Sequence, residues 1–245
     1  MKAWILVPLA LAACRRPADV ALPPERAPAG PVNELPSAVD LRPLFVEFGL
    51  APRAQGGRPT CSIFTATEAL EFACSRASNR GVRLSVEYVN WAANAATGRN
   101  DDGDFFHNAL TGFERFGACS EALLPYAGEF DASRTPPTEA LVAGGRLLGE
   151  LAARLRVRWI LPWQEGRSGL TDAQFEDARR TLAAGWPIAA GSSHSRLLVG
   201  YADDAAKPGG GAFLTLDSAV GGWSEVDYSF VKTRVNDAFV VEFAP

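Results

Sequence analysis

Lysine, histidine, cysteine and long hydrophobic runs are scarce in this sequence of 245 residues. Its lysines are Lys2, Lys207 and Lys232, and its formal net charge is −4 at pH 7. Because binding to nucleic acid needs a basic stripe that neutralises phosphates, this balance argues against a nucleic-acid partner. The apolar run over residues 3–13 is far too short to cross a bilayer as a helix.

The residues at the N-terminus fit an export signal. Lys2 provides a positive start, and the short apolar run follows it, as in a signal peptide. Leu11-Ala12-Ala13-Cys14 resembles a bacterial lipobox, in which small residues precede a cysteine that becomes lipidated. We therefore predict a signal over residues 1–14 and an exported protein that contacts a membrane only through a lipid anchor on Cys14. An ordinary secretory signal with an incidental cysteine is the alternative.

A linker and one domain account for the rest of the chain. Residues 15–37 are rich in Pro, Ala, Glu and Arg and have no hydrophobic period, which predicts an extended linker. Residues 38–245 are enough to bury a substantial core, and the overall composition is that of a globular protein.

Hydrophobic periods and capping residues predict an α+β domain whose first half is helical and whose second half is rich in strands. The predicted helices cover residues 61–80, 85–91, 105–116, 138–156 and 171–184. The predicted strands cover residues 157–161, 187–191, 196–201, 212–216, 225–230 and 238–243. The sequence therefore predicts a helical lobe followed by a β-rich lobe.

The segment around Cys61 carries the strongest chemical signal. Cys61 stands at the expected start of a helix, where the helix dipole and free N–H groups favour a thiolate. Downstream, His194 can take the thiol proton and Asp217 can hold that histidine in place. Gln55, six residues upstream of Cys61, can donate a hydrogen bond to a developing oxyanion. These are the parts of a thiol protease.

Four segments also follow the pattern of a known family. They are residues 35–42 (LPSAVDLR), the Gln55-x5-Cys61 spacing with Phe64 three places further on, residues 194–201 (HSRLLVGY), and residues 216–223 (LDSAVGGW) with Tyr228 beyond. Together they resemble the papain family of cysteine peptidases, over most of the chain from about Leu35 to Glu242. His194 and Asp217 follow Cys61 by 133 and 156 residues, in agreement with the separations in that family.

Some positions depart from the family pattern. Pro59 and Ser62 stand where the family has a glycine and an aromatic residue, and Asp217 and Ala219 replace its asparagine and tryptophan. These departures indicate a divergent, bacterial branch.

The resemblance implies a papain-like fold of two lobes with the active site in the cleft between them, and a cysteine-type endopeptidase. Cys61 would be the nucleophile and His194 the base, oriented by Asp217, while Gln55 and the backbone N–H of Cys61 would hold the oxyanion. It also implies that Trp223 shields the histidine and that Gly103 and Asp104 line the substrate cleft. We expect a peptide or protein substrate, a monomer, and no metal or organic cofactor.

Each of these residues also has a structural interpretation. Cys61 alone is more often a buried hydrophobic residue, His194 could cap a strand, Asp217 could be an exposed turn residue in a decayed site, and Trp223 could be a core aromatic. Two further functions stay open, a non-catalytic binding protein on the same fold and a thiol acyltransferase that passes the acyl group to an amine.

Two cysteines remain after Cys14 and Cys61 are assigned. Cys74 lies on the helix that begins at Cys61, and Cys119 follows the third predicted helix. In an exported protein with the resembled fold these helices pack together, so we predict a Cys74–Cys119 disulfide. Two buried free thiols are the alternative.

Overall fold

The structure is a computed structural model that describes residues 35–151 and 154–243. The predicted signal, Cys14 and the linker up to residue 34 lie outside the described residues. Leu35 begins the compact unit that contains the two lobes. Within the described part, the helices are α1 (Arg42–Glu47), α2 (Cys61–Ser78), α3 (Val86–Thr97), α4 (Phe106–Phe116), α5 (Thr138–Leu151), α6 (Asp172–Ala183) and α7 (Tyr228–Arg234). The strands are β1 (Ala38–Asp40), β2 (Leu155–Leu161), β3 (Ile188–Gly191), β4 (Arg196–Asp203), β5 (Gly211–Asp217), β6 (Gly222–Asp227) and β7 (Asp237–Phe243).

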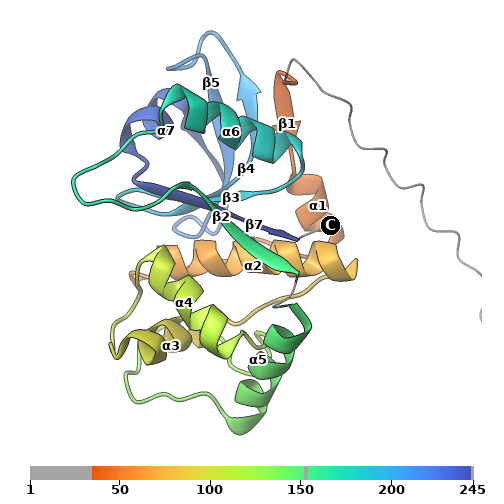
Figure 1. Ribbon diagram of the computed structural model, residues 1–245, viewed down its shortest axis with the longest axis vertical. Coiled ribbons are helices and arrows are strands. Elements are labelled where there is room, and N and C mark those ends of the chain that lie inside the picture. Colours follow the sequence, from red (N-terminus) through yellow and green to blue (C-terminus); the bar gives the residue numbers. More distant parts are fainter. Residues whose placement is uncertain (1–34, 152–153, 244–245) are drawn as a thin grey trace, which may run out of the picture. The chain divides into compact units, whose positions relative to one another are not determined.

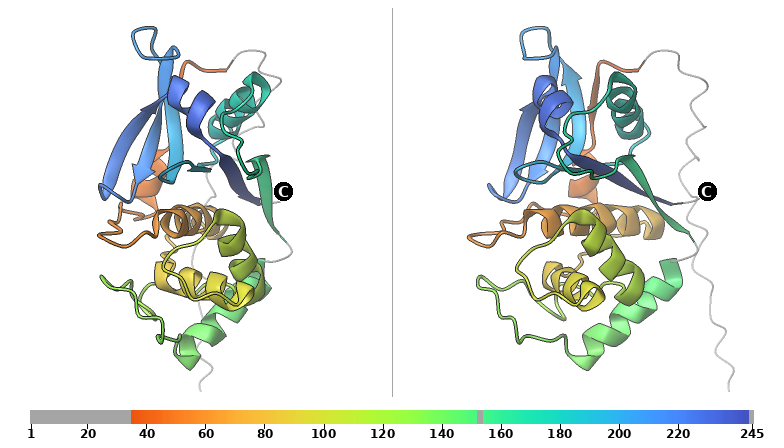
Figure 2. Two further views of the ribbon diagram at one scale, coloured as in Figure 1. Left: turned by 90° about the vertical axis from the view of Figure 1, so that its left-hand side faces the viewer. Right: turned by 60° about the vertical axis from the view of Figure 1, so that its left-hand side comes forward.

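Helix α2 is the element on which the two lobes meet. Every residue from Ile63 to Ser75 is buried, because α2 packs against α3 and α4 on one side and against strands β3, β4 and β7 on the other. Figures 1 and 2 show α2 between the sheet and the group formed by α3, α4 and α5. Most of the buried residues of α2 are apolar, as a helix packed on two sides requires, but Glu68 and Glu71 are buried among them.

The β-rich lobe is one antiparallel sheet with the strand order β2-β7-β3-β4-β5-β6, and β1 pairs with β4 beside this path. Strands β4 and β5 are hydrogen-bonded neighbours in which Leu197 lies opposite Leu216. This register brings the segment just before β4 close to the last residue of β5. Helix α6 packs on the sheet, with Thr171 as its N-cap in a capping box with Gln174.

Sequence analysis identified most elements, and the differences have local causes. The helix predicted to run to residue 156 ends at Leu151, because Leu155 instead pairs with Phe243 at the start of β2. The strand predicted over 225–230 ends at Asp227, and helix α7 follows. Tyr228 and Val231, three residues apart, are its buried residues, so they share one helical face. Helix α1 and strand β1 were not predicted.

The predicted disulfide does not form. Cys74 and Cys119 are free, buried thiols that belong to two separate hydrophobic clusters. Cys119 packs in the smaller cluster with Tyr88, Leu124 and neighbouring alanines. Burial raises the pKa of the Cys74 thiol to about 12 and that of Cys119 to about 11, so both stay protonated. Among the described residues, no helix combines the length and apolarity needed to cross a bilayer.

Candidate active site

Cys61 is the first residue of α2 and is partly accessible to solvent. The preceding residue, Thr60, uses its hydroxyl in a 2.7 Å hydrogen bond with the Tyr126 hydroxyl and not as a side-chain cap of the helix. Backbone N–H groups at the start of α2 are therefore left without a side-chain acceptor. Such a helix end stabilises a negative charge on the sulfur.

His194 and Asp217 approach Cys61 from the sheet. His194 lies two residues before β4, and its Nε2 forms a 2.7 Å hydrogen bond with Oδ1 of Asp217, the last residue of β5. This bond leaves the Nδ1 atom for the thiol of Cys61. Ser192 holds the segment, since its hydroxyl donates to the His194 carbonyl at 2.6 Å and accepts from the His194 N–H at 3.2 Å.

The surroundings of the thiol favour its ionised form. Burial alone would raise the pKa of Cys61, but hydrogen bonds from His194 and from the Ser195 backbone N–H and hydroxyl outweigh it, so the pKa lies below its usual value. The pKa of His194 is raised by its hydrogen bond with Cys61, against the effect of burial, and Asp217 adds to the increase. These opposite shifts both favour a thiolate on Cys61 beside an imidazolium on His194.

Asp217 is ionised and almost fully enclosed. Burial would raise its pKa, but hydrogen bonds from His194, from the Ala219 N–H at 2.9 Å and from Arg196 lower it below the usual value. The Ser224 hydroxyl lies 3.3 Å from the second carboxylate oxygen. Asp217 is thus held in one orientation by groups on three sides and keeps its negative charge.

Gln55 has a fixed side chain beside α2. Its Nε2 donates to the Arg58 carbonyl at 2.8 Å, and its Oε1 accepts from the Ser218 hydroxyl at 2.7 Å. The Gln55 backbone N–H donates to the Ser218 carbonyl at 2.9 Å. The second N–H of the amide has no part in these bonds. Ser218 directly follows Asp217, so one turn of the sheet lobe connects both predicted site residues.

Arg58 anchors the segment that leads to Cys61, and sequence analysis did not identify it. Its side chain is 4% exposed, and its guanidinium contacts Glu87 at 2.7 Å, Asp102 at 2.8 Å and the Ala127 carbonyl at 2.8 Å. The ring of Tyr126 lies 4.5 Å from its central carbon. The partners come from α3 and two loops, so no local pattern in the sequence could have indicated this cluster.

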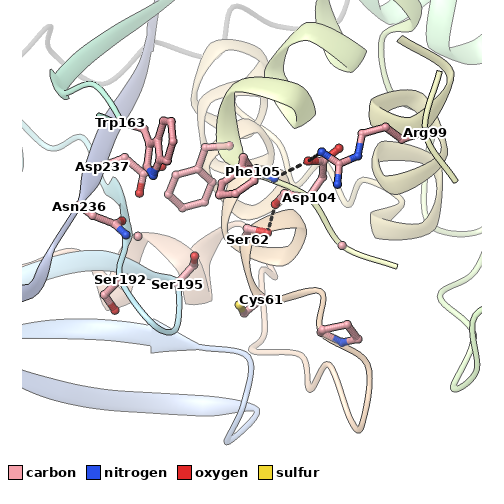
Figure 3. Close-up of a pocket in the computed structure, with 14 residues that line it drawn as sticks. Cys61, Ser62, Arg99, Asp104, Phe105, Trp163, Ser192, Ser195, Asn236 and Asp237 are labelled. Carbon is pink, nitrogen blue, oxygen red and sulfur yellow. Dashed lines mark hydrogen bonds and ion pairs between the residues drawn. The ribbon is translucent and has the colours of Figure 1, made fainter. Parts of the chain in front are cut away.

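A pocket of about 290 Å³ opens beside Cys61 (Figure 3). Its walls come from both lobes. The lining residues are Pro59, Cys61, Ser62, Arg99, Gly103, Asp104, Phe105, Phe106, Trp163, Gly191, Ser192, Ser195, Asn236 and Asp237.

Two of the predicted cleft residues, Gly103 and Asp104, line this pocket. Gly103 has a φ of +91°, and a Cβ there would lie 2.2 Å from the Pro59 carbonyl oxygen, so the close approach of the two loops requires glycine. The Ser62 hydroxyl donates to the Asp104 carbonyl, which ties the first turn of α2 to the wall of the pocket (Figure 3).

Trp223 on β6 lies opposite Leu216, the residue before Asp217. Its ring meets the ring of Phe45 edge-on with centroids 5.7 Å apart, and it is not among the pocket residues. The aromatic rim of the pocket is formed instead by Phe105 and Trp163, whose ring centroids are 5.6 Å apart and which are both exposed.

The pocket also has polar lining residues. They include Asn236 and Asp237, and burial raises the pKa of Asp237 to about 6. Trp163 and Asn236 come from loops whose composition carries no signal for this role. In the described part of the chain, no three His, Cys, Asp or Glu side chains are grouped as ligands of a metal ion.

Comparison with solved structures gives the class of fold. Xylellain, a cysteine protease from Xylella fastidiosa, aligns with a TM-score of 0.65 and 17% identity over 86% of this chain and 88% of its own. Procathepsin L 3 from the larval midgut of Tenebrio molitor aligns with a TM-score of 0.63 and 17% identity, over 86% and 71% of the two chains. Amb a 11, a ragweed pollen cysteine protease in its proform, gives 0.60 and 16%, over 88% and 69%.

The described part of the chain therefore has the papain-like, two-lobe cysteine protease fold, in α+β form. Its low identity to these proteins agrees with a divergent sequence. No protein-family model and no curated protein matches the chain.

Proposed function

We propose that this protein is a cysteine-type endopeptidase that uses Cys61, His194 and Asp217. The observation that carries the proposal is the imidazole of His194, which is hydrogen-bonded to Asp217 on the sheet while interacting with the thiol of Cys61 at the start of α2. A merely structural histidine would need only one of these partners. The papain-like fold supports the same reading.

The proposed reaction follows from these positions. The Cys61 thiolate attacks the peptide carbonyl carbon, and the oxyanion is stabilised by the backbone N–H of Cys61 and the second N–H of the Gln55 amide. The His194 imidazolium then protonates the leaving amine, and the C–N bond breaks to leave a thioester on Cys61. Water, deprotonated by His194, hydrolyses the thioester and releases the acid product. The pocket with its rim of Phe105 and Trp163 would take up a substrate side chain.

The test is the appearance of new peptide N-termini in a mixture of unfolded proteins, read by mass spectrometry. Cys61→Ala should reduce hydrolysis to background, and Gln55→Ala should lower kcat by about 10²–10³-fold. Cys119→Ala serves as a control, because it removes a thiol that lies in a separate hydrophobic cluster. Hydrolysis that survives Cys61→Ala would refute the proposal.

The same assay separates the alternatives. A binding protein on this fold would release no products, and an acyltransferase would give acyl-amine conjugates when a primary amine is added. The enclosed carboxylate and the lowered pKa of Cys61 support a reactive thiol and so favour an enzyme over a binding protein.

We also propose that the enzyme works outside the cytoplasm, anchored by lipid on Cys14, as a monomer acting on peptides or proteins. The support is the order of a positive residue, a short apolar run and Leu11-Ala12-Ala13-Cys14 in the sequence. Metabolic labelling with a fatty acid should modify the intact chain and not a Cys14→Ser variant.

A further inference from the structure

Arg196 is the first residue of strand β4 and lies two residues after His194. Its Nε donates to Oδ2 of Asp217 at 2.8 Å, while the other carboxylate oxygen, Oδ1, binds His194. A second guanidinium nitrogen lies 3.5 Å from the backbone carbonyl of His194. The side chain of Asp217 is 5% exposed and that of Arg196 is 23% exposed, so solvent screens the charges of this pair only weakly.

The charges around Asp217 give this contact a particular weight. Asp217, at the end of β5, contacts both His194 and Arg196. Cys61, at the start of α2, lies on the other side of His194. Helix α2 also carries Glu68, which is fully buried and has no hydrogen-bond partner for either carboxyl oxygen among the described residues. Burial raises the pKa of Glu68 to about 8, with the charge of Asp217 as a contributor, so Glu68 is mostly protonated at neutral pH. Arg196 therefore supplies a permanent positive charge beside an enclosed carboxylate.

An unbalanced carboxylate would change the chemistry of the pair. A negative charge 2.7 Å from the imidazole stabilises the imidazolium and makes it a weaker acid toward the leaving amine. An amide in that position would orient the ring and add no net charge. A carboxylate paired with a guanidinium likewise adds almost no net charge beside the ring.

We propose that Arg196 is a positioning residue that neutralises Asp217, so that the aspartate orients His194 without adding a full negative charge to the site. The proposal rests on the proposed function, because it assigns Arg196 to the peptidase site. It predicts that the charges of Arg196 and Asp217 act on His194 in opposite directions and cancel.

The experiment measures the pKa of the His194 ring by NMR titration of the full chain with isotope-labelled histidine. The chain has two histidines, so His107→Gln assigns the signals. All proteins carry Cys61→Ala, which prevents self-digestion and removes the coupled titration of the thiol. The added changes are Arg196→Gln, Asp217→Asn, both together, and Arg196→Lys.

Arg196→Gln should raise the pKa of His194 by about one unit, and Asp217→Asn should lower it by about as much. The double change should bring the pKa back close to that of the parent, and Arg196→Lys, which keeps the charge, should leave it close to the parent. Arg196→Met replaces Arg196→Gln if the latter does not fold, with the same upward shift expected. An unchanged pKa in Arg196→Gln, or no return in the double variant, would overturn the proposal.

Hydrolysis by the corresponding proteins that keep Cys61 tests the proposed function separately. If the pKa shifts appear and no variant hydrolyses peptides, the role of Arg196 stands and the proposed function fails. If hydrolysis is found and the pKa shifts are absent, the proposed function stands and the role of Arg196 is rejected.

Discussion

At the scale of single residues, the thiol of Cys61 differs from an ordinary thiol because of the groups that surround it. Cys61 meets a helix end, an imidazole and the Ser195 N–H, and each of them stabilises a thiolate. Cys74 and Cys119, on the same chain, are enclosed by apolar atoms and have raised pKa values. The three thiols thus provide an internal comparison of environments.

The three thiols should react with an alkylating agent at different rates, and these rates should depend differently on pH. Because the pKa of Cys61 is lowered, its thiolate forms below the pH at which a free thiol with a pKa of about 8.5 ionises. Its alkylation should already be fast near neutral pH, whereas Cys74 and Cys119 should remain unmodified in the folded protein. Peptide mapping of the full chain after timed iodoacetamide treatment measures each rate. A Cys61 rate that follows an ordinary thiol titration would contradict the expected thiolate–imidazolium pair.

At the scale of elements, the active-site loop depends on buried charge. The segment from Gln55 to Thr60 leads to Cys61 at the start of α2, and Arg58 fixes this segment to Glu87 on α3 and to Asp102 on the loop before α4. The carbonyl of Arg58 also receives the amide of Gln55. The stability of the fold and the geometry of the proposed active site are therefore connected through one arginine.

Arg58→Met should destabilise the protein by about 3–5 kcal/mol, because it removes the guanidinium that pairs with buried Glu87 and half-buried Asp102. The exposed pair Arg42–Asp40 offers a matched control, and Arg42→Ala should cost about 1 kcal/mol or less. Urea unfolding followed by fluorescence measures both. Equal, small effects of the two changes would show that the cluster around Arg58 does not anchor the loop. Adding Glu87→Gln to Arg58→Met should restore part of the lost stability.

At the scale of the whole molecule, the two lobes pack against each other through α2, and no disulfide among the described residues supports this packing. Cys74 and Cys119 lie in different hydrophobic clusters, although both are close to the helical lobe. The absence of their disulfide removes one argument for an oxidising compartment. The proposed export then depends on residues 1–14 alone.

A reducing agent should therefore leave the unfolding temperature of the purified protein unchanged, and all thiols should react after denaturation. Loss of a native disulfide would instead cost about 2–5 kcal/mol and lower the midpoint. Thermal unfolding with and without dithiothreitol, followed by thiol counting in denaturant, decides between the two. A drop in the midpoint on reduction would restore the predicted Cys74–Cys119 bridge.

Local sequence was enough to determine the elements that depend on near neighbours. Ser85 and Thr171 cap the helices that were expected after them, and the apolar run after Cys61 forms α2. The resemblance to the papain family, through the order and spacing of Cys61, His194 and Asp217, indicated these residues as partners. These features are local, or follow a pattern of order along the chain, so they can be predicted without coordinates.

Only the tertiary structure decided what surrounds those residues. The guanidinium of Arg196 on Asp217, the contacts of Arg58 and the aromatic rim of Phe105 and Trp163 join segments that are separated by 21 to 69 positions. The tertiary structure also decided that Trp223 packs against Phe45 and that the thiols of Cys74 and Cys119 do not pair. Sequence by itself determines which groups are present and in what order, but folding decides which charges and rings meet, because those contacts depend on the packing of distant elements.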